Sequence, residues 1–205
     1  MIFAVVPAAG KSVRMGRPKL TLPLGGRTVL ECVVSALRTA GVEHVLVVLG
    51  PHVADLVGLA ESTGAHALAL TEATPDMRAT VERGLSWLEE RYRPRDDDAW
   101  LLVPADHPTL DAAVVPRLLQ ARERQPETGI LVPTYENRRG HPALIAWPHV
   151  AGIRALPPGH GLNAYLRQHS AETLELPIAS PSVLWDLDTP EDYERLRSTF
   201  PNFAG

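Results

Sequence analysis

Short apolar runs alternate with stretches of helical periodicity along this chain, and this alternation restricts the fold more than any other feature. Buried strands are predicted at residues 2–6, 44–49, 67–70, 100–103, 130–132, 143–146, 174–176 and 183–185. Helices are predicted at residues 28–40, 53–62, 77–92, 111–124 and 162–169, and a last helix is capped by Thr189. Such alternation favours a mainly parallel sheet with helices on both faces. We therefore expect one α/β domain over residues 1–205, with three α/β/α layers and a Rossmann-like sheet.

The composition is that of a globular protein without a general affinity for polyanions. The chain has 205 residues, of which 45% are hydrophobic and 21% charged, and its net charge is −4. A negative net charge provides no global attraction to nucleic acid or to an anionic membrane. No apolar run approaches the roughly 20 residues of a membrane span, and the single cysteine, Cys32, excludes an internal disulfide. We expect a cytoplasmic protein with Cys32 in its core and with neither a nucleic-acid nor a membrane partner.

Residues 6–20 form a loop rich in small and basic residues after the first predicted strand. Small residues let backbone N–H groups approach a ligand closely, and Arg and Lys neutralise phosphate charge. A Walker A loop requires a glycine five positions before Gly10, where this chain has Val5. The three spaced glycines of a dinucleotide-binding loop do not occur here either. The loop is therefore predicted to hold a nucleoside triphosphate, and neither a P-loop NTPase nor a dehydrogenase is indicated.

Acidic residues follow two other predicted strands. Asp106 comes after residues 100–103, and Asp186 and Asp188 come after residues 183–185. Ligands of open α/β sheets bind at the carboxyl ends of the strands, so the loop and these carboxylates are expected to meet at one edge. The acidic run at residues 96–98 precedes a strand and is expected to be a solvated turn.

Several motifs together form a long and specific pattern. In the loop they are Ala8, Ala9, Gly10, Ser12, Arg14, Met15, Gly16 and Lys19. Asp106 with Pro108, residues 139–142 and residues 186–192 add further matches. The chain thereby resembles the MobA-like NTP transferases over nearly its whole length, and within them the molybdenum cofactor cytidylyltransferases.

This resemblance implies a reaction and a catalytic centre. A nucleoside monophosphate would pass from a triphosphate to a phosphorylated acceptor with release of pyrophosphate, on the fold of the nucleotide-diphospho-sugar transferases. Lys19, Arg14 and Asp106 are the implied catalytic residues. Mg²⁺ takes only one or two carboxylates and fills its other positions with phosphate and water. Asp106 and Asp188 are the implied ligands, with Asp186 as the alternate second ligand.

The same resemblance implies the contacts of both substrates. Nucleotide contacts are expected from Ala8, Ala9, Gly10, Lys11, Ser12, Arg14, Met15, Gly16, Lys19 and Thr80. Acceptor contacts are expected from Arg139, Gly140, His141 and Pro142. The Ala8-Ala9-Gly10 sequence is more similar to the cytidylyl than to the guanylyl branch, which favours CTP. Molybdopterin is the implied acceptor.

Some positions differ from the cytidylyl branch and leave alternatives open. They are Asp76, Thr80, Ala105, His107 and the stretch 160–163. The acceptor could then be a sugar phosphate or another phosphorylated small molecule, and a nucleotide- or cofactor-binding module without turnover is a third hypothesis. The joint presence of Lys19, Asp106 and Asp188 favours an enzyme over such a module.

Overall fold

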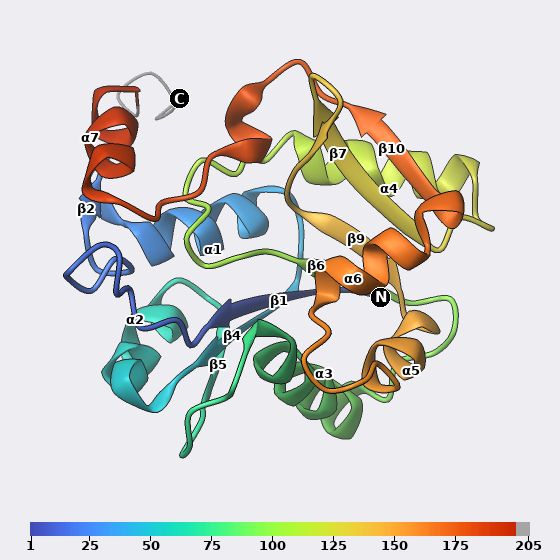
Figure 1. The fold of residues 1–205 in the computed structure, drawn as a ribbon, viewed down its shortest axis with the longest axis horizontal. Helices are drawn as coiled ribbons and strands as arrows, with labels where there is room; N and C mark the ends of the chain where they lie inside the picture. The colour runs from blue at the N-terminus through green and yellow to red at the C-terminus, as the bar shows by residue number, and fades with distance from the viewer. Residues whose placement is uncertain (200–205) are drawn as a thin grey trace.

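A mainly parallel β-sheet crosses the middle of the protein between two layers of helices (Figure 1). The structure is a computed structural model that describes residues 1–199; residues 200–205, the end of the predicted domain, lie outside the described residues. The strand order is β10-β7-β9-β6-β1-β4-β5, and β8 pairs with β7. The strands of this sheet are β1 (Ile2–Ala8), β4 (His44–Leu49), β5 (His66–Ala69), β6 (Ala99–Leu102), β7 (Ile130–Tyr135), β8 (Arg138–Arg139), β9 (Ala143–Ala146) and β10 (Thr173–Pro177).

Parallel pairing places the ends of the first strands at one edge of the sheet. β1 is parallel to β4 and to β6, β4 is parallel to β5, and β10 is parallel to β7. β9 runs antiparallel between β6 and β7. The Val103 N–H donates to the Val5 carbonyl at 3.1 Å, so the segment after β6 begins beside β1. The loops after β1 and β6 therefore leave the sheet together.

Helices cover both faces of the sheet (Figure 1). Residues of α1, α4 and α7 belong to the hydrophobic cluster on one face, and residues of α3, α5 and α6 to that on the other. The α-helices are α1 (Val29–Thr39), α2 (Val57–Ser62), α3 (Met77–Tyr92), α4 (Val114–Arg124), α5 (His149–Arg154), α6 (Leu162–Gln168) and α7 (Pro190–Thr199). The shorter elements are the 3₁₀ helices η1 (Pro51–Leu56), η2 (Ser170–Glu172) and η3 (Pro181–Leu184), and a separate hairpin of β2 (Pro23–Leu24) and β3 (Arg27–Thr28).

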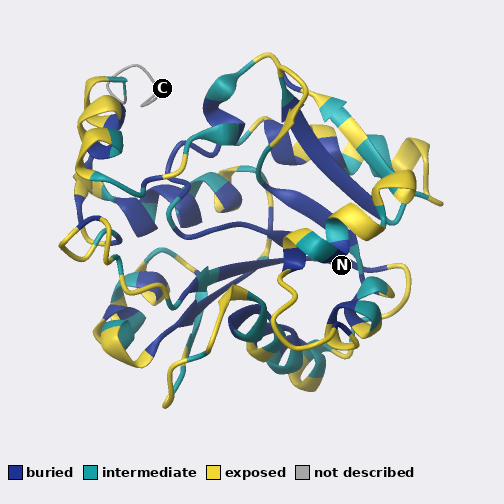
Figure 2. Ribbon diagram, viewed as in Figure 1, coloured by how far each residue is buried: buried dark blue, intermediate teal, exposed yellow. Residues whose placement is uncertain are grey.

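The apolar character of β1 follows from burial on both sides. Ala4 and Val6 belong to one hydrophobic cluster, whereas Phe3 and Val5 belong to the other. A strand covered on both faces must be apolar at successive positions and not only at alternate ones. Figure 2 shows the central strands buried and the outer sides of the helices exposed. The predicted α/β class with a mainly parallel sheet is confirmed, and Cys32 is buried as expected.

The prediction of a strand at residues 183–185 is wrong. Residues 181–184 form η3, because Pro181 stands at its start and the Ser180 hydroxyl accepts a hydrogen bond from the Ser182 N–H. The Val183 carbonyl instead accepts the His141 N–H at 2.8 Å. This hydrogen bond stands in place of the strand pairing that was expected for Val183.

Three further details differ from the sequence-based expectation. The helix predicted at residues 53–62 is instead the 3₁₀ helix η1 followed by α2, and Val53, where the prediction began, has non-helical backbone angles within η1. Asp98, expected in a solvated turn, is fully buried and accepts the Arg95 N–H at 2.7 Å. Helix α5 and the β2–β3 hairpin were not predicted, because both are too short for a clear periodicity.

Among residues 1–199, no helix has both the length and the apolar character that crossing a membrane requires.

Candidate active site

The loop after β1 folds into a tight turn that returns towards the sheet. Ser12 and Gly16 adopt left-handed backbone angles, with φ of 51° and 67°. The N–H groups of Met15 and Gly16 both donate to the Ser12 carbonyl, at 3.1 and 3.2 Å. The Met15 side chain is buried in the core, so it anchors the turn. This anchored turn brings Lys19 back beside the ends of β1 and β6.

The ammonium group of Lys19 joins the two acidic segments. Its Nζ donates to Asp106 Oδ2 at 2.5 Å and to Asp188 Oδ1 at 3.1 Å. A third hydrogen bond, of 3.0 Å, goes to the Leu187 carbonyl. An ammonium has three N–H donors, and all three are used here. The expected meeting of the loop with Asp106 and Asp188 therefore takes place at Lys19.

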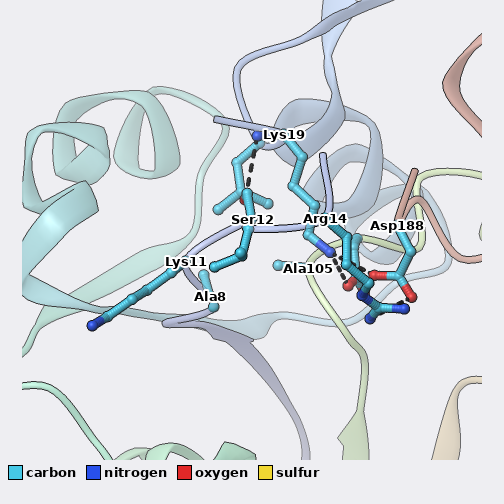
Figure 3. A pocket seen from close by; sticks show the side chains of 11 residues that line it. Ala8, Lys11, Ser12, Arg14, Lys19, Ala105 and Asp188 are labelled. Carbon is cyan, nitrogen blue, oxygen red and sulfur yellow. Dashed lines mark hydrogen bonds and ion pairs between the residues drawn. The ribbon is translucent and has the colours of Figure 1, made fainter. Parts of the chain in front are cut away.

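Arg14 adds a second positive group on the solvent side. Its Nη2 lies 3.0 Å from Asp188 Oδ2, and its side chain is 72% exposed, compared with 12% for Lys19. In Figure 3, Lys19 and Arg14 extend towards Asp188, whereas the side chain of Lys11 points away from them. Arg14 is thus free to turn towards a ligand, while Lys19 is held.

These groups surround a cavity of about 290 Å³. Its lining residues are Ala8, Gly10, Lys11, Ser12, Val13, Arg14, Lys19, Leu20, Ala105, Asp106 and Asp188. The lining includes most of the predicted nucleotide-contacting residues. Of the others in the loop, Met15 lies in the core, Gly16 forms the turn, and Ala9 does not line the cavity. The expected contacts of these three residues with the nucleotide stay predictions.

Three successive residues that line the cavity, Gly10, Lys11 and Ser12, also carry backbone donors that are unpaired in the described part of the chain. The N–H groups of Gly10, Lys11 and Ser12 donate to no acceptor within residues 1–199. The Gly10 carbonyl lies 3.1 Å from His52 Nε2, which fixes the start of the loop. The sequence contains no signal for this contact, because His52 follows a different strand and belongs to no motif. Successive unpaired N–H groups of this kind are suited to binding phosphate.

Thr80 lies apart from the cavity. It is 2% exposed, and its hydroxyl contacts Thr74 Oγ1 at 2.6 Å and the Asp76 carbonyl at 3.1 Å. Asp76 caps α3 by accepting the Ala79 N–H at 2.8 Å. Thr80 therefore holds the segment before α3, and its expected contact with the nucleotide stays a prediction.

The residues predicted to bind the acceptor also lie outside this cavity. Arg139 Nε donates to Glu175 Oε1 at 2.8 Å, on the far side of β7 from β9. Gly140 passes so close to η3 that a Cβ atom would lie 2.2 Å from the Val183 carbonyl oxygen. Burial, together with the neighbouring His107, lowers the pKa of His141 to about 4, so its ring is neutral at pH 7. The acceptor-binding role of residues 139–142 stays a prediction.

The two aspartates near the end of the chain have different partners. Asp188 contacts Lys19 and Arg14, whereas Asp186 Oδ1 lies 3.1 Å from Nδ1 of the buried His107. Burial raises the pKa of Asp186, but the hydrogen bond from His107 and nearby positive charge outweigh it, so the pKa lies below its ordinary value. Asp188 is therefore the aspartate of this pair that faces the cavity.

The site has the donor set that a hard divalent cation prefers. Two partly exposed carboxylates, Asp106 and Asp188, already converge on one cationic group, the Lys19 ammonium. Within residues 1–199 no group of three or more His, Cys, Asp or Glu side chains forms a metal site. A cation here would take carboxylate oxygens from the protein and its remaining ligands from phosphate and water, which is the usual arrangement for Mg²⁺.

A loop with free N–H groups, two cationic side chains and a carboxylate pair at a sheet edge matches a known domain. The model of the MobA-like NTP transferase domain matches residues 4–173. The chain belongs to the MobA-like NTP transferase family. The predicted family is thus confirmed, and with it the expectation of an enzyme, a nucleotidyltransferase.

Individual relatives of this MobA-like protein differ in their substrates. It is 31% identical to the phosphoenolpyruvate guanylyltransferase of Rubrobacter xylanophilus, over 97% of this chain and 94% of the relative. It is 26% identical to the molybdenum cofactor guanylyltransferase of Rhizobium meliloti, over 97% and 91% of the two chains. The manganese complex of Rv0371c from Mycobacterium tuberculosis H37Rv is similar with a TM-score of 0.76 and 26% identity, over 97% and 98% of the two chains.

Proposed function

We propose that this MobA-like protein is a Mg²⁺-dependent nucleotidyltransferase that moves a nucleoside monophosphate, CMP by preference, from the triphosphate to molybdopterin. Pyrophosphate is the second product. The observation that carries the proposal is the convergence of Asp106 and Asp188 on Lys19, at 2.5 and 3.1 Å, beside a loop with free N–H groups. A protein that only stored a nucleotide would not require this arrangement.

The reaction is a displacement at the α-phosphorus of the triphosphate. A phosphate oxygen of the acceptor forms the new P–O bond, and the bond to the oxygen that bridges the α- and β-phosphates breaks. Catalysis of such a step consists mainly of positioning and charge neutralisation. The protein must therefore hold the triphosphate rigidly and neutralise the charge that gathers on the departing pyrophosphate.

Residues of the loop supply most of these functions. The N–H groups of Gly10, Lys11 and Ser12 bind the β- and γ-phosphates. Lys19 and Arg14 face the charge on the leaving group. Asp106 and Asp188 would hold Mg²⁺, which when bound supplies further neutralisation of the phosphate oxygens. The manganese complex of the Mycobacterium tuberculosis relative supports a divalent ion in this family.

Separate observations support the choice of the base and the choice of the acceptor. Ala9 favours CTP by similarity to the cytidylyl branch, whereas the two relatives described above carry guanylyltransferase names. Molybdopterin is supported by the Rhizobium meliloti relative and by the match at residues 139–142. A second acceptor, phosphoenolpyruvate or another phosphorylated small molecule, is favoured by the 31% identity to the Rubrobacter xylanophilus relative.

One set of assays tests these assignments together. Pyrophosphate release is measured with CTP, GTP, ATP or UTP and Mg²⁺, each with molybdopterin, phosphoenolpyruvate, a sugar phosphate or no acceptor. Acceptor-dependent release with CTP and molybdopterin supports the proposal. If pyrophosphate is released only with the combination of GTP and phosphoenolpyruvate, the proposed base and the proposed acceptor are both wrong, but the proposed type of reaction is kept. No release in any combination, from folded protein, overturns the proposed function itself.

A further inference from the structure

A buried histidine joins the two segments that bear the proposed metal ligands. His107 directly follows Asp106 and is 0% exposed. Its Nδ1 lies 3.1 Å from Oδ1 of Asp186, two residues before Asp188. A carboxylate accepts hydrogen bonds, so His107 donates this bond from Nδ1. Neither His107 nor Asp186 lines the cavity of the loop.

Backbone contacts tie the same two segments together. The Leu187 N–H donates to the Asp106 carbonyl at 2.8 Å, and the Leu187 carbonyl accepts the Lys19 ammonium at 3.0 Å. The buried Thr109 hydroxyl donates to the Ser182 carbonyl at 3.2 Å. These contacts lie on both sides of the His107–Asp186 hydrogen bond along the chain. The His107–Asp186 bond is therefore one of three contacts that join the segment after β6 to the segment before α7. The three contacts together are called the clasp below.

Residues 140–141 form a third segment that contacts the clasp. The His141 N–H donates to the Val183 carbonyl at 2.8 Å, and the bare backbone of Gly140 allows this approach. The ring of His141 packs edge-on against His107, with centroids 5.7 Å apart. Residues 181–188 therefore have few alternative positions. The distance between the Asp106 and Asp188 carboxylates therefore depends in part on His107, Asp186 and His141, none of which lines the cavity of the loop.

We propose that His107 is a positioning residue that holds Asp188, through Asp186, at the distance from Asp106 that a divalent ion requires. The inference rests on the proposed function, because it concerns the same carboxylate pair. Groups that hydrogen-bond directly to metal ligands commonly contribute about 10- to 100-fold to metal affinity without touching the metal. His107 acts one step further from the metal, through Asp186, so we expect the lower end of this range. Loss of the His107 side-chain donor should therefore weaken metal binding while both ligands remain.

The test measures Mn²⁺ binding to the whole protein without nucleotide, from the electron paramagnetic resonance signal of free Mn²⁺. His107→Leu and Asp186→Ala, which remove the donor and the acceptor of this bond, should each raise the dissociation constant by about 10-fold. His107→Gln should restore most of the affinity, because an amide N–H can also donate to Asp186. The double variant His107→Leu/Asp186→Ala should bind no more weakly than the weaker single variant, because each change breaks the same hydrogen bond.

A matched control and a stability measurement separate positioning from general damage. His66→Leu removes a histidine whose Nε2 contacts the Tyr92 hydroxyl at 2.9 Å, away from the cavity, and should leave Mn²⁺ affinity unchanged. Thermal melting of each variant shows whether it is folded. If His107→Leu does not fold, Asp186→Ala decides the question, because the Asp186 side chain is 48% exposed.

The outcomes distinguish this inference from the function on which it rests. Wild-type Mn²⁺ affinity in folded His107→Leu, or in folded Asp186→Ala, overturns the positioning role. Equal weakening in His107→Gln and His107→Leu overturns it as well, since the donor would then not matter. Failure of the wild-type protein to bind Mn²⁺, or undiminished binding by Asp106→Asn, instead overturns the metal site of the proposed function.

Discussion

Lys19 Nζ lies 2.5 Å from Asp106 Oδ2, a contact between residues 87 positions apart in the chain. The same ammonium lies 3.1 Å from Asp188 Oδ1, so one cation bridges both carboxylates. Two carboxylates this close repel each other unless a positive charge lies between them. Lys19 provides this charge in the ligand-free protein, and a divalent ion would provide it in the complex. Lys19 is then available to bind phosphate.

Replacement of Lys19 by Met should abolish most of the activity while the fold persists. We expect kcat to fall by about 10²- to 10³-fold, which is typical when one preorganised group that stabilises developing charge is removed. Pyrophosphate release and thermal melting check this prediction. Lys11→Met is the control, because Lys11 points away from Asp188 (Figure 3) and should reduce kcat far less. Equal losses in the two variants would contradict the specific role of Lys19.

The same Lys19→Met variant should bind Mn²⁺ more tightly than the wild type when no nucleotide is present. The ammonium and the metal compete for the same carboxylate oxygens, so removal of the ammonium leaves the oxygens free. We expect a gain of about tenfold in Mn²⁺ affinity, which corresponds to roughly 1.4 kcal/mol of binding free energy. This is well below the Coulomb energy of a pair of unit charges at about 4 Å near a protein surface. Isothermal titration with Mn²⁺ measures the affinity of both proteins. Weaker binding in the variant would show that Lys19 organises the carboxylates instead of competing for them.

Gly140→Ala should destabilise the protein. The new Cβ would lie 2.2 Å from the Val183 carbonyl oxygen, and this backbone atom has no freedom to rotate away. Overpacking of this kind typically costs about 1–3 kcal/mol of the free energy of unfolding. Urea unfolding gives the difference. Gly58→Ala is the control: in α2 its Cβ meets nothing within 4 Å, and alanine favours a helix, so stability should be unchanged or higher.

His141 should make stability depend on pH between its unfolded and folded pKa values. Burial, followed by the effect of His107, lowers the pKa of His141 from 6.5 to about 4. The unfolded chain therefore binds a proton more readily than the folded protein, and the folded state is favoured fully above pH 6.5. This contribution is lost as the pH falls from 6.5 towards 4. Unfolding free energies measured across this range should fall by on the order of 1–3 kcal/mol.

The variant His141→Gln removes the titrating group and should flatten this part of the profile. It keeps the backbone N–H that donates to Val183. A variant with the same slope as the wild type would assign the pH dependence to other groups.

The loop after β1 could be predicted from the sequence because its signals are local. Gly16 adopts the left-handed backbone angles of the turn, four residues after Ser12. A continuous apolar run marks β1, the buried strand that precedes the loop. Strand and helix periodicities are likewise properties of neighbouring residues, so the layer order of the fold followed from them. The error at residues 183–185 has the same origin. An apolar run shows burial, but it does not show whether a neighbouring strand is available for pairing.

The partners of individual side chains depend on segments far apart in the chain. Asp186 and Asp188 are almost adjacent and chemically identical, and nothing in their spacing separates a ligand from a supporting residue. The structure directs Asp188 to Lys19 and Asp186 to His107. The contact of His52 with the Gly10 carbonyl and the burial of Thr80 are decided in the same way, by the packing of distant segments.

The sequence by itself thus determined the fold class, the family and the position of the loop that we propose to bind phosphate, because each is encoded in periodicity or in a short contiguous motif. Only the tertiary structure decided which carboxylates meet, what holds them at their distance, and that residues 139–142 pack against η3. All three features depend on where β6, η3 and the start of α7 meet at one edge of the sheet. That meeting is a property of the whole packed chain and not of any one stretch of it.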